Sequence, residues 1–186
     1  MLANKERIVE FEKEVIDEFE FLVSEYGFNR KQLIVSDLRY PPDARVSVPF
    51  IGESVGVEIV LGLGDHSISI VFYKLENGQK PKQLSFYPKS KGADAVRLET
   101  VIRKLGGSEV LLPLPEITPQ LSMAEMVRRG EARSELIRKD LGRILSKYAS
   151  LVKEYASMIM EGDVSDFQEM KEDYAKHWEI PRAKGC

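Results

Sequence analysis

The sequence is poor in the residues that most often build catalytic and metal sites. Its 186 residues include one cysteine, Cys186, and two histidines, His66 and His177. A single cysteine can neither close an internal disulfide nor form a thiolate cluster, so a disulfide framework and a multi-cysteine metal site are excluded. This cysteine usage fits a reducing compartment.

Long hydrophobic runs are also missing. No apolar stretch approaches the roughly 20 residues that a membrane-spanning helix needs. The first residues, MLANKER, are charged rather than apolar and do not resemble the core of a signal peptide. We therefore expect a cytoplasmic protein that does not bind membranes.

Nucleotide-binding patterns are absent as well. Gly62 and Gly64 lack the third glycine and the following helix of a dinucleotide fingerprint, and no phosphate-binding loop of the Walker type occurs. The acidic residues between Glu161 and Asp173 are explained by helix capping and the helix dipole. The sequence thus predicts no cofactor and no metal site.

The net charge is only −3, but basic and acidic residues are segregated along the chain. Residues 1–26 carry eight acidic and three basic side chains, whereas residues 74–104 carry eight basic and three acidic ones. Residues 127–153 repeat this basic excess. Such segregation indicates either recognition of a charged partner or packing of acidic helices on basic ones.

The strongest structural pattern lies in residues 55–73. Apolar residues recur with a period of two in 55–61 and again in 67–73, which is typical of two half-buried strands. The turn between them contains Gly62 and Gly64, which we expect to take the positive φ angles of a tight reversal. The pattern predicts an antiparallel hairpin whose apolar face needs a covering layer.

Helical periodicity flanks this hairpin. Apolar residues at steps of three and four predict a helix over residues 5–26, ended by Gly27 and lying across the sheet. The same spacing predicts a long helix over residues 131–161, ended by Gly162. A further, short helix is expected to follow it.

Shorter segments complete the expected fold. Pro49 is expected at an edge or bulge of its strand. Asp94 is a candidate N-cap for a helix that begins near Gly92 and ends at Gly106. Residues 108–119, which contain three prolines, are predicted to form an extended connector. Three further strands are predicted at residues 31–39, 45–51 and 83–87.

Together these patterns predict an α+β fold. We expect a four- or five-stranded, mostly antiparallel sheet covered by the N-terminal helix, with a C-terminal helical portion that contains one long helix. The sheet portion comprises residues 1–118 and the helical portion residues 119–186, packed as parts of one domain. Apolar residues beyond one stripe of the long helix would also suit a homo-oligomer formed through it.

Several short stretches resemble a known group of proteins. They are the segment FEFLVSEYGF at 19–28, the alternating strand at 55–61, and Tyr155-Ala156 followed by GDVSDF at 162–167. These stretches are similar to those of small bacterial α+β proteins of unknown function, some of which resemble immunity proteins that neutralise toxins. The resemblance implies a binding protein and carries no catalytic residue.

The leading hypothesis is therefore a non-enzymatic, immunity-like protein that binds and inhibits a protein partner. Segregated charge and the poor catalytic inventory agree with it. The candidate partner-binding residues are basic: Lys80, Lys82, Lys89, Lys91, Arg128 and Arg129.

Two alternatives remain open. A nucleic-acid-associated protein would use the basic segments 80–104 and 128–147, with Phe86 and Tyr87 available to stack on bases. The acidic pI of about 5.6 and the lack of a known motif count against it. A hydrolase-type enzyme would use a site near Asp65 and His66, as a carboxylate-held general base. No serine or cysteine motif accompanies that pair, so we assign no catalytic residue.

Overall fold

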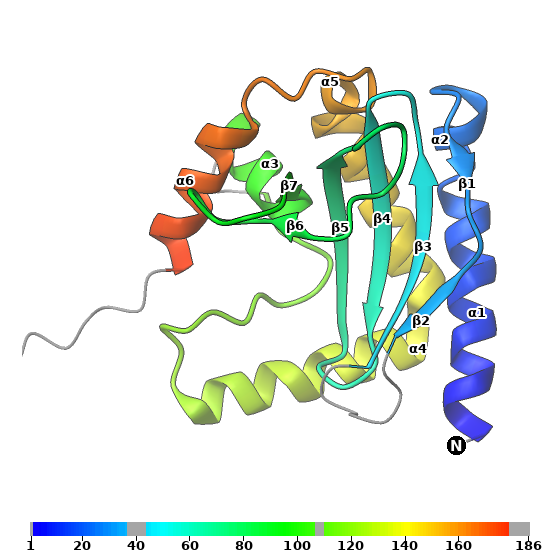
Figure 1. Ribbon diagram of the computed structural model, residues 1–186. Helices are drawn as coiled ribbons and strands as arrows, with labels where there is room; N and C mark the ends of the chain where they lie inside the picture. The colour runs from blue at the N-terminus through cyan, green and yellow to red at the C-terminus, as the bar shows by residue number, and fades with distance from the viewer. Residues whose placement is uncertain (1, 37–43, 107–109, 179–186) are drawn as a thin grey trace, which may run out of the picture.

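The computed structural model describes residues 2–36, 44–106 and 110–178. Figure 1 shows its helices and strands. The helices are α1 (Leu2–Glu18), α2 (Phe21–Ser24), α3 (Leu98–Leu105), α4 (Met123–Tyr155), α5 (Ser157–Met160) and α6 (Phe167–Trp178). The strands are β1 (Asn29–Arg30), β2 (Ile34–Ser36), β3 (Arg45–Ile51), β4 (Val55–Gly62), β5 (Ser67–Lys74), β6 (Leu84–Ser85) and β7 (Ala93–Arg97).

The strands form one sheet in the order β1-β3-β4-β5-β7-β6, with β2 also paired to β3. All pairs are antiparallel except β6 with β7. The predicted hairpin is confirmed as β4 and β5, which pair from Val55–Lys74 to Gly62–Ser67. The fold is therefore α+β with a mostly antiparallel sheet, as the sequence predicts.

The predicted number of strands, four or five, is wrong, because the sheet has seven. The two extra strands are β1, which is only two residues long, and β7, at residues that were expected to open a helix. The expected strand at 83–87 is present as β6, shortened to Leu84–Ser85. The expected strand at 31–39 is shorter, Ile34–Ser36, and residues 37–39 lie outside the described residues. Pro49 lies opposite the interruption between β1 and β2, which fits its expected place at a bulge.

One face of the sheet carries the main hydrophobic core. Alternate residues of β3, β4 and β5, such as Val48, Ile59 and Ile70, are buried there together with side chains of α1 and α4. Figure 1 shows α4 behind the central strands and α1 beside it, and the two helices contact each other. Side chains from both sides of the predicted boundary at residue 118 thus share one core.

The N-terminal helix is interrupted near its end. Residues 5–26 were predicted to form one helix, but α1 ends at Glu18 and α2 begins at Phe21. Gly27 takes a φ of +70°, as expected for a helix C-cap, and the N–H of Phe28 donates to the carbonyl of Leu22. The break turns Phe19, Phe21 and Phe28 into the core, where each is buried.

The predicted helix start near Asp94 is wrong. Residues 93–97 form β7, because β5 offers an open edge to which Ala95 and Val96 pair, one on each face of the sheet. The carboxylate of Asp94 accepts a hydrogen bond from Lys171 instead of capping a helix. The helix begins at Leu98 and ends, as predicted, at Gly106.

The long helix begins earlier than predicted. Its N-cap is Ser122, whose side chain accepts a hydrogen bond from the N–H of Glu125, and it runs to Tyr155. Asp140, with φ −156° and ψ 57°, introduces a kink. The predicted end of the long helix at Gly162 is wrong, because Ala156 leaves helical geometry at φ −114° and ψ 12°. Gly162, with a φ of +101°, instead follows the short helix α5.

None of the helices in the described segments has the length and apolar character needed to cross a membrane. Most apolar residues that suggested an oligomer seam are buried within the chain itself, including Leu145, Ala156 and Met160. Leu136 remains 41% exposed. An oligomer formed through α4 therefore stays a prediction.

Candidate functional site

The six basic residues predicted to bind a partner fall on two separate parts of the fold. Four of them lie between β5 and β7, and two lie in the first half of α4, which Figure 1 shows well apart from that segment. The two groups comprise Lys80, Lys82, Lys89 and Lys91, and Arg128 and Arg129, respectively.

Three of these six side chains already have acidic partners. The ammonium of Lys80 lies 2.7 Å from each carboxylate oxygen of Glu58. Arg128 and Arg129 contact the carboxylate of Glu125 at 2.9 and 3.3 Å. The remaining side chains are exposed: Lys82, Lys89 and Lys91.

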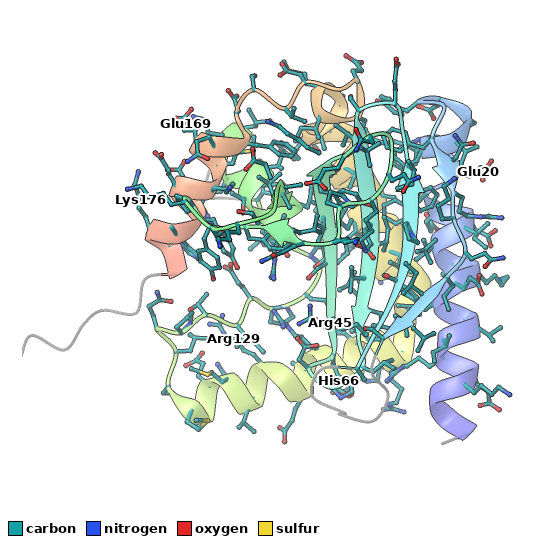
Figure 2. The ribbon with its side chains drawn as sticks, in the orientation of Figure 1. Glu20, Arg45, His66, Arg129, Glu169 and Lys176 are labelled. Atoms are coloured by element: carbon teal, nitrogen blue, oxygen red, sulfur yellow. The ribbon has the colours of Figure 1, made fainter. Side chains whose placement is uncertain are left out.

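Asp65 and His66 lie in the turn between β4 and β5, and Figure 2 shows His66 at the tip of this hairpin. The residue with positive φ in the turn is His66, at 49°, and not Gly62 or Gly64 as predicted. Asp65 accepts hydrogen bonds from the hydroxyl and the N–H of Ser67, and no described contact joins it to His66. The arrangement does not form a carboxylate–histidine pair.

A cavity lies beside the first half of β5. Because β7 pairs with β5 only at residues 71–73, residues 67–70 have no strand neighbour on that side in the described structure. Residues of β5, α3, the connector 110–121, α4 and α6 surround this edge. The cavity volume is about 230 Å³. Pockets for drug-sized molecules measure roughly 300–1,000 Å³, so this cavity suits a smaller ligand.

We call this cavity the arginine pocket, because three arginines contribute to its wall. Its wall contains six charged residues and the buried aromatic residue Tyr148. The charged residues are Asp65, Arg97, Glu99, Arg103, Glu116 and Arg133.

The junction of β7 and α3 supplies three of these charged residues: Arg97, Glu99 and Arg103. Arg97 has extended backbone angles and serves as the N-cap residue of α3, which directs the chain from strand to helix within one residue. Glu99 and Arg103 follow at a spacing of four, so they lie on one helix face. Leu98 and Val101, on another face of α3, are fully buried and fix the helix against the core.

Two arginines of α4 hold the connector in place. The Nε of Arg133 donates to the carbonyl of Pro115, and an Nη of Arg129 donates to the carbonyl of Glu116, both at 2.6 Å. A segment without sheet partners needs such donors for its carbonyl groups. Arg129, a predicted partner-binding residue, therefore shapes the pocket wall; Figure 2 shows it on α4 below the connector.

The carboxylate of Glu116 links three elements beside the pocket. Its Oε1 lies 3.5 Å from an Nη of Arg103 and 3.5 Å from the Nε2 of His177. Arg103 belongs to α3 and His177 to α6, so this carboxylate holds the connector between both helices.

Three polar atoms of the pocket residues are buried without a hydrogen-bond partner in the described structure. They are the Nε of Arg97, the Nη1 of Arg103 and the Oε2 of Glu99. Most buried polar groups in proteins have a partner, and an unmet one costs about 1–3 kcal/mol, more when charged. The Arg97 guanidinium also lies 5.3 Å from the ring of Phe86 and 5.8 Å from that of Tyr174, which restrict its orientation.

Burial changes the acid–base properties of the same groups. Burial raises the pKa of Glu99, because its carboxylate loses hydration, while the charges of Arg97 and Arg133 act in the opposite direction. Burial lowers the pKa of Arg133 and raises that of Tyr148. It also raises the pKa of Tyr174 to about 12. Several shifted groups around one cavity are a common feature of functional sites.

A second cavity, of about 450 Å³, lies over the other side of β3. Its charged lining residues are Lys31 and Lys80, and Lys80 is already bound to Glu58. No buried polar atom without a partner belongs to its described lining. The arginine pocket is therefore the better candidate.

The chemistry of the arginine pocket is that of its side chains. Within the described residues, no three histidine, cysteine, aspartate or glutamate side chains lie close enough together to hold a metal ion. The pocket offers guanidinium donors, carboxylates and an apolar wall from Leu112, Leu114 and Ile117. Such a set can bind and orient a small charged molecule.

Sequence reasoning missed this pocket. Arg97, Arg103 and Arg133 entered only as part of the basic excess of their segments. Two local signals were available: the pair of opposite charges around the apolar Leu98, and Glu116 as the one charged residue in the otherwise apolar stretch VLLPLPEITP.

Comparison of this chain with protein-family models, with curated proteins and with solved structures gives no match.

Proposed function

We propose that this protein is a binding protein that takes up a small anion in the arginine pocket. The observation that supports the proposal is the presence of two buried guanidinium donors, Arg97 Nε and Arg103 Nη1, without partners beside a cavity. An oxyanion such as a carboxylate or phosphate accepts hydrogen bonds from guanidinium groups with matching planar geometry.

The surroundings of the pocket strengthen such an interaction. The rings of Phe86 and Tyr174 lie 5.3 and 5.8 Å from the Arg97 guanidinium, which limits the side-chain freedom that is lost when it binds an anion. Its Nε is covered by neighbouring side chains, so binding requires a small side-chain rotation, as is common at binding surfaces. The connector that covers the pocket is held by Arg129 and Arg133.

The experiment is a thermal-shift screen of small anions, followed by calorimetric titration of the strongest ligand. Acetate, succinate, inorganic phosphate and free amino acids form the screen, and wild type is compared with Arg97→Met. We expect at least one anion to raise the Tm of wild type and to lose most of its affinity in Arg97→Met. Arg128→Met, which removes an exposed arginine outside the pocket, is the matched control.

If Arg97→Met unfolds, Arg103→Gln provides the second test, and circular dichroism checks the fold of both. An anion that binds wild type and Arg97→Met equally would contradict the proposal. So would the absence of any bound anion in the screen.

A protein partner remains a second candidate. Leu111, Met123 and Val127 are 92, 75 and 54% exposed, and such apolar side chains favour contact with another protein. The immunity-like function predicted from the resemblance would use such a surface together with the exposed lysines. An affinity pull-down from native lysate tests it, with Leu111→Ser as the variant that should lose the partner. An unchanged yield of the partner in Leu111→Ser would argue against this surface.

Nucleic-acid binding is supported by one local feature. Tyr87 is 49% exposed and lies in the same segment as Lys82, Lys89 and Lys91, which could contact phosphates while the ring stacks on a base. Binding of this kind weakens steeply as salt increases, because phosphate contacts release counterions. Failure to bind any DNA or RNA at low salt would end this alternative.

A further inference from the structure

The buried polar atoms of the arginine pocket that have no hydrogen-bond partner belong to groups of opposite charge. Arg97 Nε and Arg103 Nη1 are donors on cations, whereas Glu99 Oε2 belongs to a carboxyl group. A ligand that carries only an anionic group would satisfy the arginines and leave the Oε2 of Glu99 buried without a partner. Because such a group is costly, the pocket favours a ligand that satisfies both kinds of atom.

The charged residues of the whole pocket wall also favour a ligand that carries both a negative and a positive group. Three arginines line the pocket, and so do three acidic residues. They are Arg97, Arg103 and Arg133, and Asp65, Glu99 and Glu116. A ligand with no net charge preserves this balance, whereas a simple anion adds unpaired negative charge near Glu99 and Glu116.

Two of the three acidic residues of the wall already have partners within the protein, which limits the groups that can bind a ligand cation. Glu116 is paired with Arg103 and His177, and Asp65 is bound to Ser67. Glu99 is thus the acidic group available to a ligand cation. Two donors and one carboxyl group match, in number and charge, a carboxylate with its two oxygens and an ammonium group.

Resting on the proposed function, we propose that the ligand of the arginine pocket is a free amino acid, whose carboxylate binds Arg97 and Arg103 and whose ammonium group binds Glu99. The remaining wall, with Leu112, Leu114 and Ile117 from the connector, is apolar and accommodates an aliphatic side chain. The cavity volume of about 230 Å³ fits a ligand of this size class.

The experiment uses matched ligands that differ in one charged group. The amino acid that raises the Tm of wild type most among all L-amino acids is compared, by calorimetric titration, with its des-amino carboxylic acid and its decarboxylated amine. We expect the amino acid to bind about 10- to 100-fold more tightly than the carboxylic acid, the effect of one charged hydrogen bond. The amine should bind more weakly still.

Variants of the protein test the binding of the ligand's ammonium group and of its carboxylate separately. Glu99→Gln keeps the shape of the side chain but removes its charge, so it should lose the preference for the amino acid and still bind the carboxylic acid. Arg97→Met should weaken both ligands. Glu172→Gln, at an exposed carboxylate on α6, is the matched control and should bind both like wild type.

The outcomes distinguish this inference from the function on which it rests. Equal affinity for the amino acid and its des-amino acid, or an unchanged preference in Glu99→Gln, would overturn the amino-acid ligand while an anion-binding pocket stands. Binding of phosphate or succinate but of no amino acid would do the same. No binding of any anion would overturn both.

Discussion

Lys171 and Asp94 form an ion pair of 2.7 Å that joins α6 to β7. The ammonium of Lys171 is buried, with 3% of its side chain exposed, and it also donates to the hydroxyl of Ser85 in β6. One side chain thus holds the last helix against the sheet strand that leads into the arginine pocket. The pair explains why Asp94 lies in a strand rather than at a helix cap.

Removing Asp94 should destabilise the fold more than removing Lys171. Asp94→Ala leaves a buried ammonium with Ser85 as its remaining partner, and we expect a loss of about 3 kcal/mol in unfolding free energy. Lys171→Met removes the charge itself and should cost less. Urea unfolding of both variants measures the difference, and equal losses would contradict this account.

Replacement of Lys80 should lower the unfolding free energy of the protein and not only its binding of a partner. Glu58 is 6% exposed and binds Lys80 and the hydroxyl of Ser47, so Lys80→Met leaves a buried carboxylate without its cation. We expect a loss of about 3 kcal/mol in unfolding free energy. The control Lys82→Met, at an exposed lysine, should change it by less than about 0.5 kcal/mol. Similar stability of the two variants would contradict the prediction.

Gly56 and Tyr73 form a close contact on the outer face of the sheet. A Cβ at residue 56 would lie 2.3 Å from the Tyr73 ring, so Gly56→Ala should destabilise the fold by about 1–3 kcal/mol. The Tyr73 hydroxyl is buried without a partner, so Tyr73→Phe should be neutral or stabilising. Chemical unfolding tests both, and a large loss in Tyr73→Phe would show that the hydroxyl has a partner.

Glu99 should make stability depend on pH. Because its pKa is raised in the folded chain, the folded state holds this proton more tightly than the unfolded state, whose pKa is about 4.3. The unfolding free energy should therefore fall as pH rises from about 4.3 through the raised pKa. The charged groups that act on Glu99 from neighbouring elements are Arg97, Arg133 and Glu116.

Glu99→Gln should remove this slope. The difference in unfolding free energy between variant and wild type should change in favour of the variant as pH rises above about 5. Asp94 does not interfere there, because its pKa is lowered by the hydrogen bond from Lys171 and its contribution is lost only at lower pH. Parallel pH profiles of the two proteins would contradict the burial of the Glu99 carboxyl.

Local patterns predicted the parts of the fold that depend on neighbouring residues. The alternation in 55–73 gave the central hairpin with its apolar face, and Gly27 gave the helix end at its observed φ. These features follow from side-chain period and backbone conformation alone. The junction of β7 and α3 could not be predicted in the same way, because Asp94 has a partner 77 residues further along the chain.

The arginine pocket could not be predicted from local patterns either, because its residues come from segments that are distant from one another in the sequence. Arg97, Glu116 and Arg133 meet only after the connector has folded over the open edge of β5. None of them belongs to a motif with a fixed spacing. The basic residues that did stand out, Lys80 and Arg129, instead hold parts of the chain together.

The most direct test of the central claim is to follow the Nε–H signals of arginine by ¹H–¹⁵N spectroscopy while inorganic phosphate, acetate and L-amino acids are added in turn. Arg97→Lys assigns the Arg97 signal, and the exposed Arg128 provides the internal reference. The account predicts that the signal of Arg97 moves in a saturable way with at least one of these anions while that of Arg128 stays in place. An Arg97 signal unchanged by every one of them would contradict a ligand-binding role of the arginine pocket.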